Sequence, residues 1–101
     1  SPYLALYVFE CDGQPAGYGQ LSFTYSGEAG GLCVLLEEIY VRPAFQGRGL
    51  GTEYLQFVKA EYEKKAVRLR LEACPSNRKA IRLYKKIGFS ELPYVQMIMD
   101  R

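Results

Sequence analysis

The residues best suited to bind an anion are three closely spaced glycines. Gly47, Gly49 and Gly51 follow an apolar stretch of β type at 32–41 and open a segment with helical periodicity. The start of a helix carries unpaired backbone N–H groups and the positive end of its dipole, and glycine leaves these groups accessible. The spacing predicts a phosphate-binding turn made of backbone amides. It fits neither a Walker loop, which needs Gly-Lys-Ser/Thr, nor a dinucleotide fingerprint, whose third glycine comes later.

Two adjacent carboxylates, Glu37 and Glu38, precede this turn. The chain has no histidine, so proton transfer must use Glu, Asp, Tyr, Cys or Lys. A primary amine with a pKa of about 10.4 is almost fully protonated at pH 7 and needs a base to become a nucleophile. A carboxylate near a second one is suited to that task. A regular strand would send only one of the two to a given face, and a bulge would relax that rule. The alternative is a pair of solvated surface charges.

Two separated segments resemble the signatures of the GCN5-related N-acetyltransferase (GNAT) superfamily. The first is Gln46-x-x-Gly49-x-Gly51, preceded by Tyr40-Val41-x-Pro43, and the second is the segment Asn77-Arg78-Lys79-Ala80-Ile81-Arg82-Leu83-Tyr84-Lys85-Lys86-Ile87-Gly88-Phe89. They occur in the family's order, with one expected helix and one expected strand between them. The resemblance covers about residues 32–89. Within it, the segment 36–41, Leu-Glu-Glu-Ile-Tyr-Val, is similar to the corresponding strand of diamine and polyamine acetyltransferases.

The resemblance implies that acetyl-CoA places its diphosphate on the turn amides and its pantetheine arm along the preceding strand. The implied coenzyme A contacts are Ile39, Tyr40, Val41, Gln46, Gly47, Arg48, Gly49, Leu50, Gly51, Thr52, Asn77, Lys79, Ala80 and Tyr84. Asn77 is equally suited to be a helix cap. Tyr84 is implied to stand near the CoA sulfur, where a phenol can protonate a thiolate. A packing role is the alternative for Tyr84.

By the same resemblance, Glu37 is the general base and Glu38 binds the amine. The implied reaction transfers the acetyl group to a primary amine of a small molecule, such as a diamine or polyamine, or of a peptide, by direct attack in a ternary complex. A covalent route through Cys74 ranks lower because no histidine accompanies the thiol. The alternative function is a catalytically inactive acyl-CoA-binding module. Nucleic-acid binding is not expected, because the basic residues are spread over two expected helices and a strand.

Composition limits the other possibilities. A chain of 101 residues has the size of one domain. Three widely spaced cysteines and no histidine argue against a disulfide framework and a metal site. The sequence shows neither an apolar run of membrane-spanning length nor a secretory leader, so a cytoplasmic protein without membrane contact is expected.

The expected elements are strands, two helices and glycine-rich connections. We expect strands at 3–11 and 16–25 joined by an Asp12-Gly13 turn, a third strand at 32–42, a helix at 50–65, a strand at 67–73, a helix from Asn77 to Gly88, and closing strands at 90–92 and 94–100. Gly17 and Gly19 predict a bulge or a close backbone approach in the second strand.

This order predicts an α+β domain of three α/β/α layers, with a mixed, mostly antiparallel GNAT-like sheet. Compared with the family, the first strand and helices, which supply part of the acceptor pocket, are missing. Residues 1–101 are therefore expected to form a single, N-terminally truncated acetyltransferase domain, or a homodimer in which the partner supplies that wall.

Overall fold

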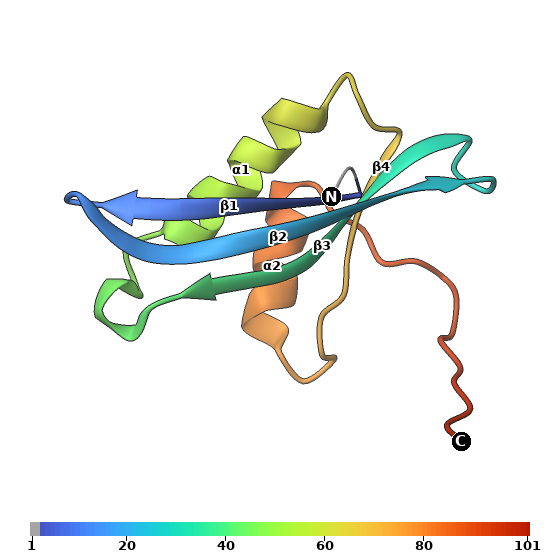
Figure 1. Ribbon diagram of the computed structural model, residues 1–101. Coiled ribbons are helices and arrows are strands. Elements are labelled where there is room, and N and C mark those ends of the chain that lie inside the picture. The colour runs from blue at the N-terminus through green and yellow to red at the C-terminus, as the bar shows by residue number, and fades with distance from the viewer. Residues whose placement is uncertain (1–2) are drawn as a thin grey trace.

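The computed structural model describes residues 3–101, which form one four-stranded sheet and two α-helices (Figure 1). The elements in order are β1 (Leu4–Cys11), β2 (Gln14–Ser26), β3 (Gly31–Val41), the 3₁₀ helix η1 (Pro43–Phe45), α1 (Leu50–Tyr62), β4 (Arg68–Leu71) and α2 (Arg78–Ile87). The strands lie in sequence order, with β1, β2 and β3 antiparallel and β4 parallel to β3. The predicted α+β class and the mixed, mostly antiparallel sheet are confirmed. In the described part of the chain, no helix is long and apolar enough to span a membrane.

The hairpin between β1 and β2 turns at the predicted dipeptide. Asp12 has φ 54° and Gly13 has φ 77°, the positive values that a two-residue turn between twisted strands requires. The turn fixes the β1–β2 register, in which Leu6 faces Gln20 and Val8 faces Tyr18.

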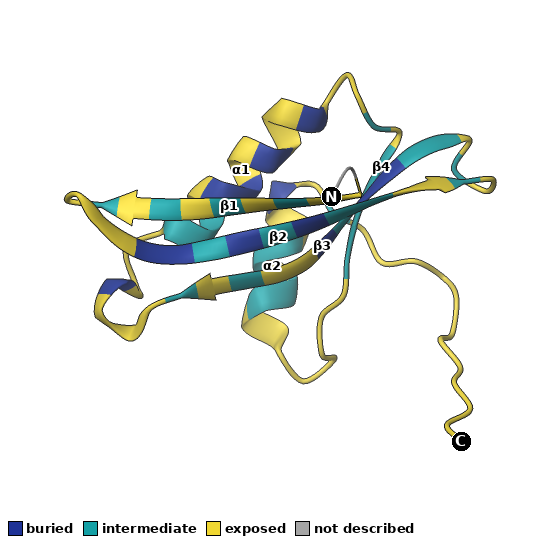
Figure 2. Cartoon of the chain, viewed as in Figure 1, coloured by how far each residue is buried: buried dark blue, intermediate teal, exposed yellow. Residues whose placement is uncertain are grey.

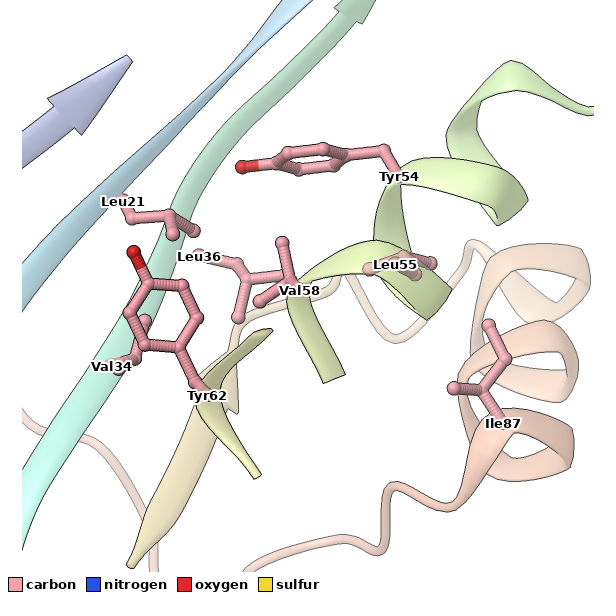
Figure 3. Close-up of a cluster of buried hydrophobic side chains, with 8 residues drawn as sticks. All are labelled: Leu21, Val34, Leu36, Tyr54, Leu55, Val58, Tyr62 and Ile87. Atoms are coloured by element: carbon pink, nitrogen blue, oxygen red, sulfur yellow. The ribbon is translucent and has the colours of Figure 1, made fainter. Parts of the chain in front are cut away.

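The core lies between the sheet and α1. Leu21, Val34 and Leu36 of the strands meet residues of α1, and Ile87 of α2 belongs to the same cluster (Figure 3). The α1 members of this cluster are Tyr54, Leu55, Val58 and Tyr62. Burying such a set of apolar side chains is the main favourable term in folding.

Both helices lie on the same side of the sheet, behind it in the view of Figure 1. The described residues therefore form two layers, whereas the sequence predicted three. On the opposite face of β1, the side chains of Leu4, Leu6 and Val8 stay exposed. The physical reason is that no other segment of residues 3–101 covers this face. We call it the open face, and the face that α1 and α2 cover the helix-covered face.

The two predicted strands at 90–92 and 94–100 are wrong, because residues 90–101 form no strand. Residues 90–101 are exposed along their whole length (Figure 2), and Val95 and Met97 are among them. A hydrogen bond from Gln96 Nε2 to Glu72 Oε1 at 3.0 Å holds this segment near the end of β4, and Glu91 Oε2 lies 3.1 Å from Lys85 Nζ of α2. An alternating apolar pattern makes a strand only where a neighbouring strand pairs with it. Other boundaries differ less: α1 ends at Tyr62 rather than 65, and β4 covers only part of 67–73.

The predicted close backbone approach is confirmed at Gly17, whereas the close neighbour of Gly19 is a side chain. A Cβ atom at Gly17 would overlap the backbone oxygen of Tyr40, and one at Gly19 would overlap the ring of Tyr54. The β1–β2 register also shifts between Phe9 and Glu10. Glycine is needed at Gly17 for close strand approach and at Gly19 to make room for an aromatic ring from α1.

Candidate active site

The glycine turn joins β3 to α1 through η1. Gln46 Nε2 donates to the carbonyl of Val41 at 3.1 Å, and the buried Phe45 anchors the turn. Gly47 and Gly49 have φ values of 79° and 78°, in the region that glycine adopts without strain. Gly49 is the N-cap of α1.

The outer surface of this turn is accessible. A Cβ atom added at Gly47, Gly49 or Gly51 would meet nothing within 4 Å. At the start of α1, the amide of Glu53 donates to the carbonyl of Gly49 at 2.9 Å. The amides that precede it in the first turn have no acceptor within the helix. These are the N–H groups of Leu50, Gly51 and Thr52, three of the residues that the resemblance implies as coenzyme A contacts. They can receive an anion together with the helix dipole.

Arg48 places a positive charge beside the turn. Its guanidinium lies 5.2 Å from the centroid of the Phe45 ring and 3.8 Å from Asp12 Oδ2 in the β1–β2 turn. Half of the Arg48 side chain is exposed, so its charge remains available to a phosphate.

The free edge of β3 leads directly to the turn. β4 pairs with β3 only from Cys33 to Leu36, whereas β2 follows β3 to Val41. In the described part of the chain, Ile39, Tyr40 and Val41 therefore have a pairing strand on one side only. An extended ligand can add to such an edge as a further strand does. The resemblance implies that the pantetheine arm lies along this stretch of β3.

A β-bulge places both glutamates on the open face. Gln20 pairs with Glu38 and Leu21 pairs with Leu36, which leaves Glu37 as the extra residue. The bulge that would relax strand alternation is therefore present. Glu37 and Glu38 are both exposed.

Two hydroxyl groups of β2 hold these carboxylates. Tyr18 Oη donates to Glu38 Oε1 at 2.8 Å, and Ser22 Oγ donates to Glu37 Oε1 at 3.3 Å. The hydrogen bond with Glu38 raises the pKa of Tyr18 above its ordinary value near 10, so this phenol is protonated at neutral pH. The ring of Tyr18 lies 5.7 Å from that of Tyr40, its partner in the β2–β3 register.

Sequence reasoning missed Tyr18 and Ser22. Both could have been found by aligning the second strand against the third, because each lies two residues from Gln20, one on either side of it, and shares its face. The alignment would also have required the position of the bulge, which the sequence does not mark.

The second signature begins a helix, as predicted. Asn77 is the N-cap of α2, and its Oδ1 accepts from the amide of Ala80 at 3.3 Å. The capping role that the sequence left open for Asn77 is therefore present. Lys79 lies in the exposed first turn of this helix.

Tyr84 lies on the helix-covered side of the sheet. It packs against the core cluster, and its ring lies 6.2 Å from that of Phe89. Tyr84 and Cys74 line a groove between β4, α2 and the C-terminal segment. Neither the two glutamates nor the glycine turn lines this groove. The structure thus brings Glu37, Glu38 and the β3 edge together, and places Tyr84 apart from the carboxylates.

All three cysteines are free thiols. Cys74 is exposed, and its hydrogen bond with Ser76, with 3.1 Å between Sγ and Oγ, lowers the pKa of the thiol. Among residues 3–101, no cluster of three or more His, Cys, Asp or Glu side chains could hold a metal ion.

Comparison with known proteins identifies the family of the chain. Residues 1–89 match the model of the acetyltransferase (GNAT) family. The chain belongs to the GNAT acetyltransferase family.

Among curated proteins, the chain is similar to the thialysine N-epsilon-acetyltransferase of Bos taurus. The identity is 33% over 91 residues, which cover 84% of this chain and 53% of that protein. The chain thus spans about half the length of this curated relative.

Among solved structures, a probable acetyltransferase is 26% identical with a TM-score of 0.81, over 99% of this chain and 71% of that one. The aminoglycoside N-acetyltransferase AAC(6')-Iy in complex with CoA has the same fold. Its TM-score is 0.79 at 24% identity, over 98% of this chain and 77% of that one.

Proposed function

We propose that this chain is the cofactor-binding part of an N-acetyltransferase that moves the acetyl group of acetyl-CoA to a primary amine. The observation that carries the proposal is the free edge of β3 at Ile39–Val41, which runs directly into the accessible amides at the start of α1. This edge suits an extended amide-bearing arm, and the amides suit a diphosphate.

Acetyl-CoA fits this arrangement in two parts. Its diphosphate would lie on the amides of the turn from Gln46 to Thr52, with Arg48 adding a positive charge. Its pantetheine arm would lie along Ile39, Tyr40 and Val41. The relative AAC(6')-Iy was solved with CoA, which supports this choice of cofactor. Asn77, Lys79 and Ala80 are proposed as further contacts from the start of α2.

The acceptor would approach the acidic pair on the open face. Glu37 would take a proton from the ammonium group, and the nitrogen lone pair would form a bond to the thioester carbon. The nitrogen, which becomes cationic on attack, would lose its second proton to solvent. The C–S bond would then break to give the neutral amide, and the thiolate would leave with its electron pair. Glu38 would bind the cationic amine. Because a carboxylate so placed acts on the amine and not on CoA, cofactor binding should not depend on it.

Tyr84 is the proposed proton donor to the departing thiolate. It lies on the opposite side of the sheet from the two glutamates. Beyond the end of β4, β3 has no second paired strand. The proposed place of the thioester sulfur is this free edge, between the face that carries the glutamates and the face that carries Tyr84.

The proposed acceptor is a small-molecule amine of the diamine or polyamine kind, or a peptide amine. The names of the relatives support an amine, since one acts on thialysine and another on aminoglycosides. Two adjacent carboxylates on one face also complement a substrate with more than one positive charge.

The proposal is tested by placing a negative charge where the diphosphate would lie. Gly51→Glu adds a carboxylate in open space at an ordinary helical φ, and an acidic residue in a first helical turn does not weaken the helix. We expect calorimetric acetyl-CoA binding to be lost.

Gly27→Glu is the matched control, because that glycine is equally open and lies in the β2–β3 loop. It should bind acetyl-CoA as the wild type does. Unchanged affinity of Gly51→Glu would contradict the proposed cofactor site. Intact binding in a full-length protein that acetylates none of a panel of amines would favour an acyl-CoA-binding module.

A further inference from the structure

The two carboxylates on the open face differ in how β2 holds them. Glu38 accepts a short hydrogen bond of 2.8 Å from the Tyr18 phenol, whereas Glu37 accepts a longer one of 3.3 Å from Ser22. A phenol is a stronger donor than an aliphatic hydroxyl, and donation to a carboxylate stabilises its ionised form. The two side chains are adjacent in sequence and share a face, but they are not equivalent.

The Tyr18 ring is itself held in place. Tyr18 and Tyr40 are partners in the β2–β3 register, and their ring centroids lie 5.7 Å apart in a tilted arrangement. A tyrosine that packs on a neighbouring ring loses rotamer freedom before it makes its hydrogen bond. The Tyr18 hydroxyl therefore holds the carboxylate of Glu38 at a fixed position on the sheet.

The rings of Tyr18 and Tyr40 also form an aromatic surface beside Glu38. Tyr40 is 44% exposed, so part of its ring can still be reached from solvent. Ammonium groups and the alkyl chains that carry them bind favourably against tyrosine rings, above all beside a carboxylate. The exposed ring and the held carboxylate together suit a cationic amine with an alkyl arm.

We propose that Tyr18 is a positioning residue for the acceptor amine: it holds Glu38 oriented as the ammonium-binding carboxylate and leaves the proton transfer to Glu37. This inference rests on the proposed acetyltransferase function. In this arrangement each carboxylate accepts one hydrogen bond from β2, and the bond to Glu37 is the longer one and comes from the weaker donor. The division of roles is set by the β2 residues that face each carboxylate.

The test is Tyr18→Phe, which removes the phenol donor and keeps the ring against Tyr40. With the full-length protein and a diamine as acceptor, we expect KM for the amine to rise roughly tenfold, as for loss of a hydrogen bond to a charged group. The kcat should stay within about twofold, and the Kd of acetyl-CoA should not change. The matched control is Tyr25→Phe on the same strand, whose ring is 82% exposed and which should behave as the wild type.

A second variant separates positioning from a general effect on the sheet. In a Glu38→Gln background, Tyr18→Phe should add little to KM, because the carboxylate that it positions is gone. An equal effect in both backgrounds would overturn the inference, as would a fall in kcat at unchanged KM. If the wild type acetylates the diamine and Tyr18→Phe has the same KM, this inference is overturned, but the proposed function is not. A wild-type protein that acetylates no amine overturns the proposed function and this inference with it.

Discussion

Tyrosines occupy both faces of the sheet, and their surroundings give them different roles. On the helix-covered face, Tyr54 and Tyr62 of α1 are buried, and Tyr62 Oη lies 3.0 Å from Tyr7 Oη. On the open face, Tyr18 packs on Tyr40 and donates to Glu38. Tyrosine thus fills the core on one face of the sheet and, at a different position, binds a charged group on the other face.

The phenols on both faces resist ionisation, for different reasons. Burial is the main cause that raises the pKa of Tyr54, to about 12, and that of Tyr62. For Tyr18, the main cause is the hydrogen bond with Glu38. The direction of the pKa shift is therefore the same on both faces, and only its main cause separates the core tyrosines from the one that binds a carboxylate.

The largest expected effect is on the open face. If Glu37 is the general base, Glu37→Gln should lower kcat/KM for the amine roughly 10²- to 10⁴-fold at neutral pH. The loss should shrink as pH rises, because more of the free amine is then neutral without help. A pH–rate profile measures both effects.

The control for this variant is Glu63→Gln, which removes an exposed charge just beyond α1. It should change neither kcat nor KM. A loss that is the same at every pH would make Glu37 an amine-binding charge instead. No loss at all would transfer the role of base to Glu38 or to another group.

An intermediate effect is expected where the helix-covered face is most tightly packed. Gly19→Ala would place a Cβ atom against the ring of Tyr54, and overpacking of this kind typically costs about 1–3 kcal/mol. We expect a lower free energy of unfolding in urea. Gly27→Ala, at an open position, is the control.

The contact between Gly19 and the Tyr54 ring can be tested by making the same substitution in a Tyr54 variant. In Tyr54→Leu, the ring is gone, and Gly19→Ala should cost much less there. An equal cost in both backgrounds would show that Gly19 is needed for its backbone rather than for room.

The smallest expected effect is a gain in stability. In the part of the chain that the structure describes, the Tyr54 hydroxyl is buried with no hydrogen-bond partner. An unsatisfied buried polar group is costly, so Tyr54→Phe should stabilise the fold by about 1 kcal/mol. A urea titration at neutral pH measures the difference, and a lower stability would indicate that the hydroxyl has a partner such as a buried water.

The pH dependence of the same variant has a definite sign. A folded-state pKa raised to about 12 means that the neutral phenol contributes stability fully below pH of about 10, and that this contribution is lost as pH rises through about 12. Wild type should therefore lose stability more steeply than Tyr54→Phe above pH of about 10. Parallel curves for the two proteins would contradict the burial of this phenol.

The sequence by itself determined the elements with strong local signals. The Asp12-Gly13 dipeptide predicted the hairpin, helical periodicity predicted α1 and α2, and Asn77 predicted a cap. The glycines from Gly47 to Gly51 predicted the accessible turn. These features depend on backbone conformations that a few residues fix locally, so a short stretch of chain contains all the information.

Tertiary structure alone decided which side chains meet. That both glutamates share a face depends on a bulge at Glu37, and a bulge exists only relative to the register of β2. The partnership of Tyr18 with Glu38 follows from the same register. The segment 94–100 has the apolar alternation of a strand, but strand formation requires a paired neighbour, and within the described residues none is present. Contacts between strands link residues far apart in sequence, and no local pattern contains them.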